Sequence, residues 1–388
     1  MRHTLFILSI LIASTNIVCY GQESQVQDSI NQSKPGLIQR VINYFNETNK
    51  TEITSRPNFS FIGGPHYSSD SKFGLGLVVA GLYSTNPTDN LLPPSNISIK
   101  FDATTAAHFE LKLSGEHIAP ADKYRINYSV AFSSIETKFW GVGMSQCKND
   151  DNESDYKYLA YKVRADFGWR IGKHIYAGPM VAMDYVNARD YEKPELWEGL
   201  PSIMMSYGAG VTARLDTRDS STEPMHGWLV RVDQLFNISR ASHATGHYAV
   251  NEFTVANYQT LWKGATLASR LHGKVTWGDT PWGMMPYIGG SYDMRGYFEG
   301  RYRAKNEIDL CVELRQHVWR RNGVVVWGGV ASLFNRFVSK YYETNNSGWL
   351  PNWGIGYRWQ FKQRMNVRVD FGFGKGQSGI IFNLNEAF

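Results

Sequence analysis

One segment of the sequence matches a phosphate-binding motif, and its surroundings argue against that chemistry. The segment GKGQSG, with Gly374, Gly376 and Gly379, has the G-x-G-x-x-G spacing in which backbone amides bind the pyrophosphate of a dinucleotide. That chemistry requires a strand before the glycines and a helix after them, whereas strand-like sequence flanks this segment on both sides. We therefore expect a hairpin turn here and no nucleotide cofactor.

The spacing of residues along the sequence indicates no catalytic site and no metal site either. No G-x-S-x-G motif supplies a nucleophile for a lipase-like reaction, and the histidines lack a paired catalytic motif. No group of His, Cys and carboxylate residues has the spacing of a structural metal site. We predict that the protein is not an enzyme and binds no cofactor and no metal; a phospholipase of the barrel type is the enzyme alternative.

One charged residue stands in a context that raises a question of ion pairing. Arg295 lies in the segment GGSYDMRGYFEGRYR, which is too rich in glycine for a helix and too interrupted for a strand. On an exposed loop, an ion pair of this arginine would contribute about 1 kcal/mol or less. In a partly dehydrated interior, breaking such a pair costs roughly 3–5 kcal/mol, because a charge is left without a partner. The role of Arg295 therefore depends on the elements that surround it, and a solvated arginine in a mobile loop is the alternative.

The first 21 residues have the layout of a secretory signal peptide. Arg2 and His3 form a basic start, residues 5–18 an apolar stretch, and cleavage is predicted after Gly21. A membrane anchor is one alternative, but about 14 apolar residues are short for the ~20 of a spanning helix. Lipid attachment at Cys19 is a second alternative, which the residues before it disfavour.

The composition favours an exported β-protein. Aromatic residues make up 14% of the 388 residues, 36 are glycine, and beyond the signal no run of apolar residues is long enough for a helical membrane span. A formal charge of +5 gives no reason to expect a nucleic-acid partner. Beyond the signal the chain has only Cys147 and Cys311, so its stability is not expected to come from disulfides.

Strict alternation of apolar and polar residues recurs along the chain, as in HFELKLS, YRINYSV and WGIGYRWQF. A soluble β-sandwich also alternates. In this sequence, however, the apolar face carries Trp and Tyr near the strand ends, and the opposite face carries charges or glycine. Aromatic girdles on the outside and a polar inside are typical of a transmembrane barrel. The chain also finishes in SGIIFNLNEAF, so we expect the terminal aromatic Phe388 to lie on a strand.

Counting strands predicts an all-β fold, a 16-stranded antiparallel transmembrane β-barrel over residues 58–388. Closure of the barrel would satisfy every backbone amide in lipid. Residues 22–57 would form a short periplasmic segment, in which 37–45 have the spacing of an amphipathic helix; a loosely ordered leader is the alternative. Short turns are assigned to the periplasm and long polar loops to the outside. The predicted strands are 58–66, 73–85, 95–104, 107–117, 121–133, 155–169, 173–187, 201–217, 225–238, 248–264, 265–277, 306–319, 323–334, 351–363, 365–375 and 378–388.

The alternation also selects carboxylates that could pair with Arg295. In EIDLCVELR the apolar residues of the alternation would face lipid, so Asp309 and Glu313 would face the lumen. In NVRVDFGF the same reasoning turns Asp370 inward. Arg295 falls between the predicted eleventh and twelfth strands, in the sixth extracellular loop. We therefore expect Asp309, Glu313 or Asp370 to be its ion-pair partner.

The loop motif and the strand count together resemble the BamA/TamA superfamily of outer-membrane barrels (bacterial surface antigen type), over residues 58 to the end. In that family a (V/L/M)-R-G-(Y/F) motif in the sixth loop folds back into the barrel, where its arginine meets carboxylates of the inner wall. The matching residues here are Arg295, Gly296 and Tyr297. The segment DTRDSSTEPMHGW is similar to the R-D…P-x-x-G periplasmic turn of the family, with Asp216, Arg218, Asp219, Pro224 and Gly227 as the matching residues.

The resemblance has two departures. About 35 residues lie between the predicted signal peptide and the first predicted strand, which is too few for one of the periplasmic POTRA modules with which family members capture clients. The strand VVVWGGVASLF lacks the acidic residue that the family often has there, so that part of the lumen network is expected to be absent or replaced by Asp370.

The functional expectation is a bacterial outer-membrane protein that lies in the lipid bilayer. The resemblance implies a role in assembling or moving protein or lipid at that membrane, with a separate periplasmic or outer-membrane partner. A passive channel is one alternative, and a structural surface-antigen barrel is another.

Overall fold

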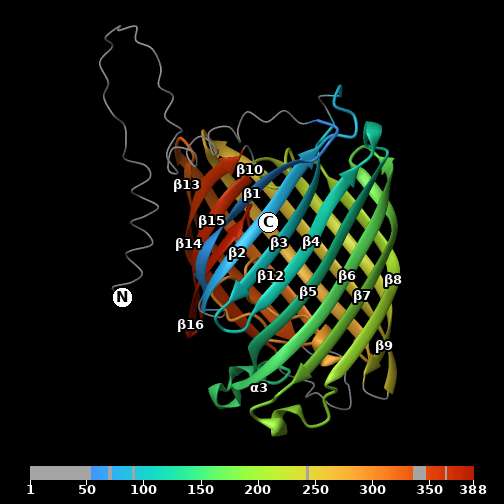
Figure 1. Cartoon of the computed structure of the whole chain (residues 1–388), viewed down its shortest axis with the longest axis vertical. Coiled ribbons are helices and arrows are strands. Elements are labelled where there is room, and N and C mark those ends of the chain that lie inside the picture. Colours follow the sequence, from blue (N-terminus) through green and yellow to red (C-terminus); the bar gives the residue numbers. More distant parts are fainter. Residues whose placement is uncertain (1–53, 69–71, 90–91, 242–243, 335–346, 363–364) are drawn as a thin grey trace, which may run out of the picture. The chain divides into compact units, whose positions relative to one another are not determined.

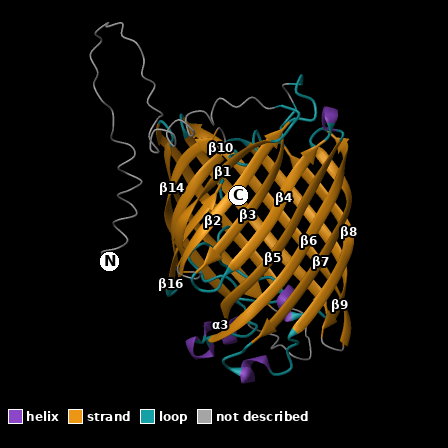
Figure 2. Cartoon of the chain, in the orientation of Figure 1, coloured by secondary structure: helices purple, strands orange, loops and turns teal. Residues whose placement is uncertain are grey.

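The structure, a computed structural model, describes residues 54–68, 72–89, 92–241, 244–334, 347–362 and 365–388. The expected signal peptide (1–21) and the predicted amphipathic helix (37–45) lie outside the described residues. The described part of the chain forms one antiparallel sheet whose 16 strands follow one another in sequence order (Figures 1 and 2). The predicted fold class is confirmed.

The strands are β1 (Asn58–Ser68), β2 (Lys72–Tyr83), β3 (Ser95–Thr104), β4 (Phe109–Ile118), β5 (Tyr124–Phe139), β6 (Ser154–Gly172), β7 (Ile175–Arg189), β8 (Ile203–Asp216), β9 (Gly227–Ala241), β10 (Ala244–Trp262), β11 (Ala265–Gly278), β12 (Asn306–Trp319), β13 (Asn322–Phe334), β14 (Gly348–Lys362), β15 (Met365–Gly374) and β16 (Gln377–Leu384). The helices are short: η2 (Pro120–Asp122), α3 (Met144–Lys148), η3 (Asp150–Asn152), η4 (Pro194–Trp197) and η5 (Trp282–Met284). Within the described ranges, no helix has the length and apolarity needed to cross a membrane.

The two faces of the sheet are inverted relative to a soluble protein. Large apolar side chains project outward, and Ile171, Phe236 and Trp349 are 69%, 66% and 69% exposed. Charged side chains fill the inside, where Glu313 and Arg368 are both 0% exposed. An outer belt of apolar and aromatic residues around a charged interior is the arrangement that a lipid-facing barrel wall requires.

The edges of the sheet are β1 and β16, which lie beside each other where the sheet curls round. Every neighbouring pair from β1–β2 to β15–β16 has a hydrogen-bonded register. Between the described residues of β1 and β16 there is no such register, so the expected closure is not made by a continuous ladder. Among the described strands, this seam therefore lacks the continuous ladder that every other junction of the wall has.

The last strand is shorter than predicted. β16 ends at Leu384, and Asn385 has a left-handed backbone with φ of 59°. The prediction that Phe388 lies on a strand is therefore wrong. The physical reason is electrostatic: Glu386 is drawn inside the barrel, where its carboxylate accepts hydrogen bonds from Arg358 at 2.8 Å and Asn366 at 2.9 Å.

Candidate functional site

The connection between β11 and β12, residues 279–305, is called loop six here, and it folds back on itself as an irregular hairpin. Backbone hydrogen bonds join Ile288 N to Tyr302 O at 3.1 Å and Ala304 N to Pro286 O at 3.2 Å. The apolar side chains of loop six pack in a buried cluster with residues of α3, β13 and β14: Met144, Cys147, Ile288, Met294, Tyr297, Tyr302, Ala304, Ala331, Leu333 and Leu350. Loop six is thus fixed to the inside of the wall.

Arg295 lies at the centre of this arrangement and is 1% exposed. Its Nη1 donates a hydrogen bond to Asp370 Oδ2 at 2.6 Å, and its Nη2 donates to Glu313 Oε1. The guanidinium also lies over the ring of Trp327, 3.8 Å from the ring centre. A buried arginine held by two carboxylates and an aromatic face has its charge fully compensated, and removing it would take one charge-assisted hydrogen bond from each carboxylate.

Gly296 allows this close approach. Its φ is 109°, a region that favours glycine, and a Cβ at this position would stand 2.5 Å from Phe373 N in β15. The facing position in β15 must also lack a side chain, because a Cβ on Gly372 would stand 2.6 Å from Arg295 C. Backbone therefore packs directly on backbone, and both positions are restricted to glycine.

Tyr297 fixes the next position of the motif. Its hydroxyl donates to Pro351 O at 2.7 Å and accepts a hydrogen bond from Lys375 N at 2.9 Å. Its ring lies against the backbone of Gly374, where an added Cβ would come within 2.6 Å of the ring. Arg295, Gly296 and Tyr297 thus each contact β15 or the turn that follows it.

A wider ion-pair network surrounds Arg295. Arg358 Nη1 lies 2.6 Å from Asp370 Oδ1 and its Nε 2.8 Å from Glu386 Oε2. Arg315 Nη2 lies 2.9 Å from Glu313 Oε2, and Arg368 Nη1 2.8 Å from Asp370 Oδ2. Four arginines therefore share three carboxylates, and the network connects loop six, β12, β14, β15 and the segment after β16.

The turn between β8 and β9 contains the second predicted motif. Arg218 donates from Nε and Nη2 to the two carboxylate oxygens of Asp216, at 2.9 and 3.0 Å. Asp219 Oδ1 accepts hydrogen bonds from the backbone amides of residues 225 and 226, while Pro224 is buried. Gly227 has φ of 109°, and a Cβ there would stand 2.3 Å from Thr217 O. The five motif residues thus build one compact turn.

This turn also reaches the segment that follows β16. The backbone amide of Glu386 donates to Thr222 O at 3.3 Å, and Asn366 Nδ2 donates to Glu223 Oε1 at 2.8 Å. The ring of Phe388 lies near that of Tyr258, with ring centres 6.4 Å apart. The two sequence motifs are therefore linked through the network around Glu386.

The structure separates one predicted carboxylate from Arg295. Asp309 contacts Arg270 at 2.8 Å and His272 at 2.9 Å instead. The expected pairing of Asp309 with Arg295 is wrong, because Asp309 lies four residues before Glu313 on β12, which at ~3.3 Å per residue is about 13 Å along the strand. Glu313 and Asp370, the other two predicted partners, do contact Arg295.

Sequence reasoning missed Trp327, Arg358 and Glu386 as members of the site. Arg358 stands on the polar face of the alternation in WGIGYRWQF, but local sequence does not indicate its partner. Trp327 belongs to the strand in which an acidic residue was expected, and there an aromatic face takes the place of a second charge. The signal that could have found Glu386 is its charge, because a carboxylate is costly on a lipid-facing strand.

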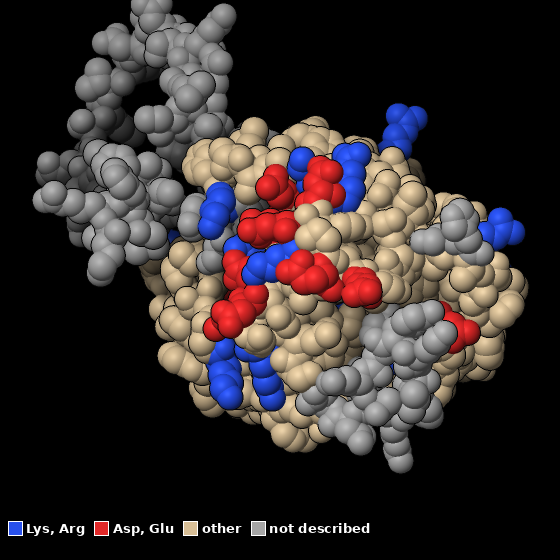
Figure 3. All heavy atoms as spheres, turned by 90° about the horizontal axis from the view of Figure 1, so that it is seen from below, with Lys and Arg blue, Asp and Glu red and all other residues tan. Residues whose placement is uncertain are grey.

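Charged side chains also mark one end of the barrel. Figure 3 views the end that carries α3, and acidic and basic residues lie side by side across this face. Among the ion pairs of the loops and strand ends on this side are Lys157–Asp190 at 2.9 Å and Arg301–Asp150 at 2.5 Å. The second pair joins loop six to η3.

Comparison with known proteins shows similarity in fold. No protein-family model matches the sequence, and no curated protein sequence is similar to it. The structure of BamA from Haemophilus ducreyi lacking POTRA domains 1–3 aligns with a TM-score of 0.51 at 11% identity, over 85% of this chain and 70% of that one. CdiB from Escherichia coli aligns with a TM-score of 0.54 at 8% identity, over 89% of this chain and 70% of that one. This chain therefore has a barrel fold of the kind found in BamA and CdiB.

Proposed function

We propose that this protein is an integral outer-membrane barrel that assists the assembly or translocation of protein or lipid at that membrane, together with a separate partner protein. The observation that carries the proposal is the position of loop six, which Arg295 anchors inside the barrel. A lumen occupied in this way is unsuited to a wide passive pore, because the anchoring residues would have to leave a buried, charge-compensated site.

The seam between β1 and β16 supports the same proposal. A wall whose strands are all hydrogen-bonded offers no lateral exit, whereas two strand edges without a shared register can separate at lower cost. An edge strand is also a template on which another strand can pair. The seam thus gives an assembly function a physical route at the lipid-facing wall.

A narrow channel is the second candidate. A cavity of about 200 Å³ remains between loop six and the wall, and it is lined by charged residues of both signs, among them Lys100, Asp102 and Glu110. A mixed-charge cavity favours passage of water or small ions over a strongly selective pore. The two candidates differ in the current that the purified barrel should carry.

Isolation of the tagged protein from native outer membranes tests the proposal. We expect a separate periplasmic or outer-membrane protein to co-purify, and an unrelated barrel with the same tag from the same membranes is the control. A disulfide scan that joins positions 59–61 of β1 to positions 378–382 of β16 should abolish rescue of the deletion strain's outer-membrane composition. An unchanged outer membrane in the deletion strain, with no co-purifying protein, would contradict the proposal.

A further inference from the structure

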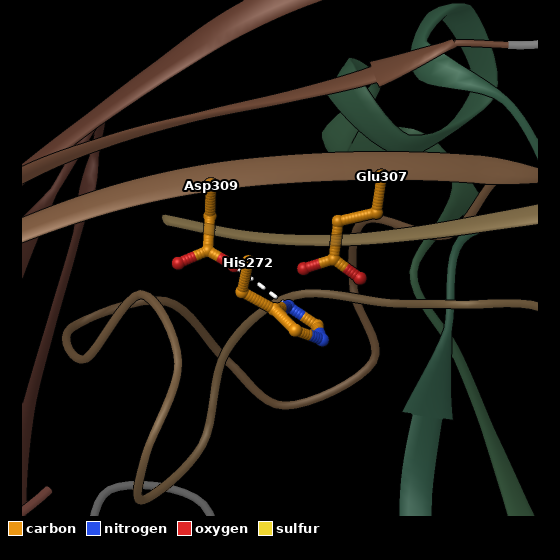
Figure 4. Close-up of side chains that lie close together, drawn as sticks. All are labelled: His272, Glu307 and Asp309. Atoms are coloured by element: carbon orange, nitrogen blue, oxygen red, sulfur yellow. Dashed lines mark hydrogen bonds and ion pairs between the residues drawn. The ribbon is translucent and has the colours of Figure 1, made fainter. Parts of the chain in front are cut away.

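Three side chains that the ion-pair network does not use meet on the inner wall beside loop six. His272 comes from β11, and Glu307 and Asp309 come from the inner face of β12 (Figure 4). His272 is the register partner of Asp309, and the next inward pair along the strands is Lys274 and Glu307. One ligand atom from each of the three residues lies within 4.8 Å of the others. Two neighbouring strands therefore bring an imidazole and two carboxylates together.

Glu307 has an unsatisfied buried oxygen at this place. The residue is 3% exposed, and its Oε1 has no hydrogen-bond partner. Figure 4 shows its carboxylate pointing toward His272 beside that of Asp309. Burying an ionised carboxylate without a partner is costly, and native proteins avoid it unless another charge or a metal compensates it.

The ring of His272 lies between carboxylates at both nitrogens. Nδ1 is 2.9 Å from Asp309 Oδ2, and Nε2 is 3.3 Å from Glu252 Oε1. A neutral imidazole can donate at only one of these nitrogens, so either a second proton or a cation must stand at the other. With a metal at Nδ1, the Nε2–H would donate to Glu252, which is the arrangement by which a carboxylate orients a metal-binding histidine.

The three residues lie among further charged side chains. Arg270 forms ion pairs with Asp293 and Asp309, and Lys274 forms one with Glu252. Among these carboxylates, Glu307 is the one whose Oε1 lacks a hydrogen-bond partner, and a bound cation would supply a positive partner there.

We propose that His272, Glu307 and Asp309 form a binding site for a divalent transition-metal cation, with Zn²⁺ as the best match to one imidazole and two carboxylates. Zinc holds such donors about 2.0–2.2 Å away, so small side-chain rotations would bring the three ligands to it. Arg270 contacts Asp309 of β12 and also Asp293 of loop six. Because its ligands come from β11 and β12, the cation would join these two strands near the two ends of loop six. This proposal does not depend on the proposed function.

Zinc binding by the full chain tests this site directly. The protein, purified in detergent with a tag that contains no histidine, is treated with a chelator, dialysed against micromolar Zn²⁺, and analysed for metal content. We expect one more Zn²⁺ per chain in the wild type than in Glu307→Gln or His272→Gln. His117→Gln is the matched control, because His117 bonds to the hydroxyl of Tyr83 at 2.8 Å and should leave binding unchanged.

Heat stability separates a metal site from an ordinary ion-pair cluster. Zn²⁺ should raise the unfolding temperature of the wild type but not that of Glu307→Gln. Without metal, Glu307→Gln should be at least as stable as the wild type, because it removes a carboxylate from a buried place where one of its oxygens has no hydrogen-bond partner. Equal zinc content in the wild type and Glu307→Gln, or zinc binding by neither, would overturn the proposal. Heat-modifiable migration on gels identifies any variant that has not folded.

Discussion

Gly372 of β15 lies so close to the backbone of Arg295 that an added Cβ would stand 2.6 Å from Arg295 C. This contact holds loop six against the inner wall without any side chain from β15 at that point. The position of loop six therefore depends on the absence of a side chain at Gly372, in addition to the ion pairs of Arg295.

Gly372→Ala should displace loop six and lower the stability of the barrel by about 1–3 kcal/mol, the usual cost of forcing a methyl group into a packed site. Heat-modifiable migration on gels and limited proteolysis of loop six would measure the two effects. Gly328→Ala in β13 is the matched control, because a Cβ there meets nothing within 4 Å. If the two variants behave alike, loop six does not pack against β15 as described.

Arg295→Ala should be more damaging, with a loss of roughly 3–5 kcal/mol, because it leaves Glu313 and Asp370 with less positive charge in a buried site. Protease access to loop six should rise in the same variant. Lys157→Ala removes an ion pair whose partners are 51% and 58% exposed, so it should leave the stability of the barrel nearly unchanged. A loss for Arg295→Ala no greater than for Lys157→Ala would mean that Arg295 is solvated.

Cys147 of α3 packs against loop six and can therefore report on its position. It is 0% exposed, burial raises the pKa of its thiol to about 11, and its neighbours in the buried cluster include Ile288 and Tyr302 of loop six. Since the thiolate is the reactive form, folded protein should resist alkylation at neutral pH. In a Cys311→Ala background, Arg295→Ala should label faster than the parent with a small maleimide, and heat-unfolded samples give the maximum. Equal labelling rates would show that loop six stays in place without Arg295.

Glu386→Gln tests the link between the segment after β16 and the rest of the network. The substitution keeps the shape of the side chain but removes the charge that Arg358 and Arg315 contact at 2.8 and 3.6 Å. We expect a loss of about 1.5–3 kcal/mol, typical of a hydrogen bond to a charged group. Glu195→Gln, at an exposed position of η4, serves as the control in the same denaturation assay. An unchanged midpoint would place Glu386 outside the network.

The fold could be predicted closely from the sequence because a barrel wall imposes the same rule at every strand. The alternation runs from Ile97 to Ala103 in β3 and from Ile308 to Leu314 in β12, and the predicted bounds 95–104 and 306–319 coincide with the observed ones. The rule also states which side chains face the lumen, which is why Glu313 and Asp370 could be selected as partners for Arg295.

Alternation predicts which face of the sheet a side chain lies on, but not its height along the barrel axis relative to residues of neighbouring strands. The prediction of the site was limited for this reason. Asp309 shares a face of β12 with Glu313 but lies at a different height along the barrel, where its carboxylate contacts Arg270 and His272. Trp327 could not be predicted because the family pattern indicates an acid on that strand, and the group of His272 and Glu307 could not be predicted because its members come from two strands. The turn after Leu384 depends on ion pairs across the lumen, which local sequence does not specify.

The current carried by the purified barrel in a planar bilayer tests the central claim most directly. A lumen closed by loop six, as the contacts of Arg295 and Gly296 require, should give no large steady open-channel current in the wild type. Arg295→Ala should show more frequent or longer openings under the same voltage. Large, steady currents through the wild-type protein would contradict the account.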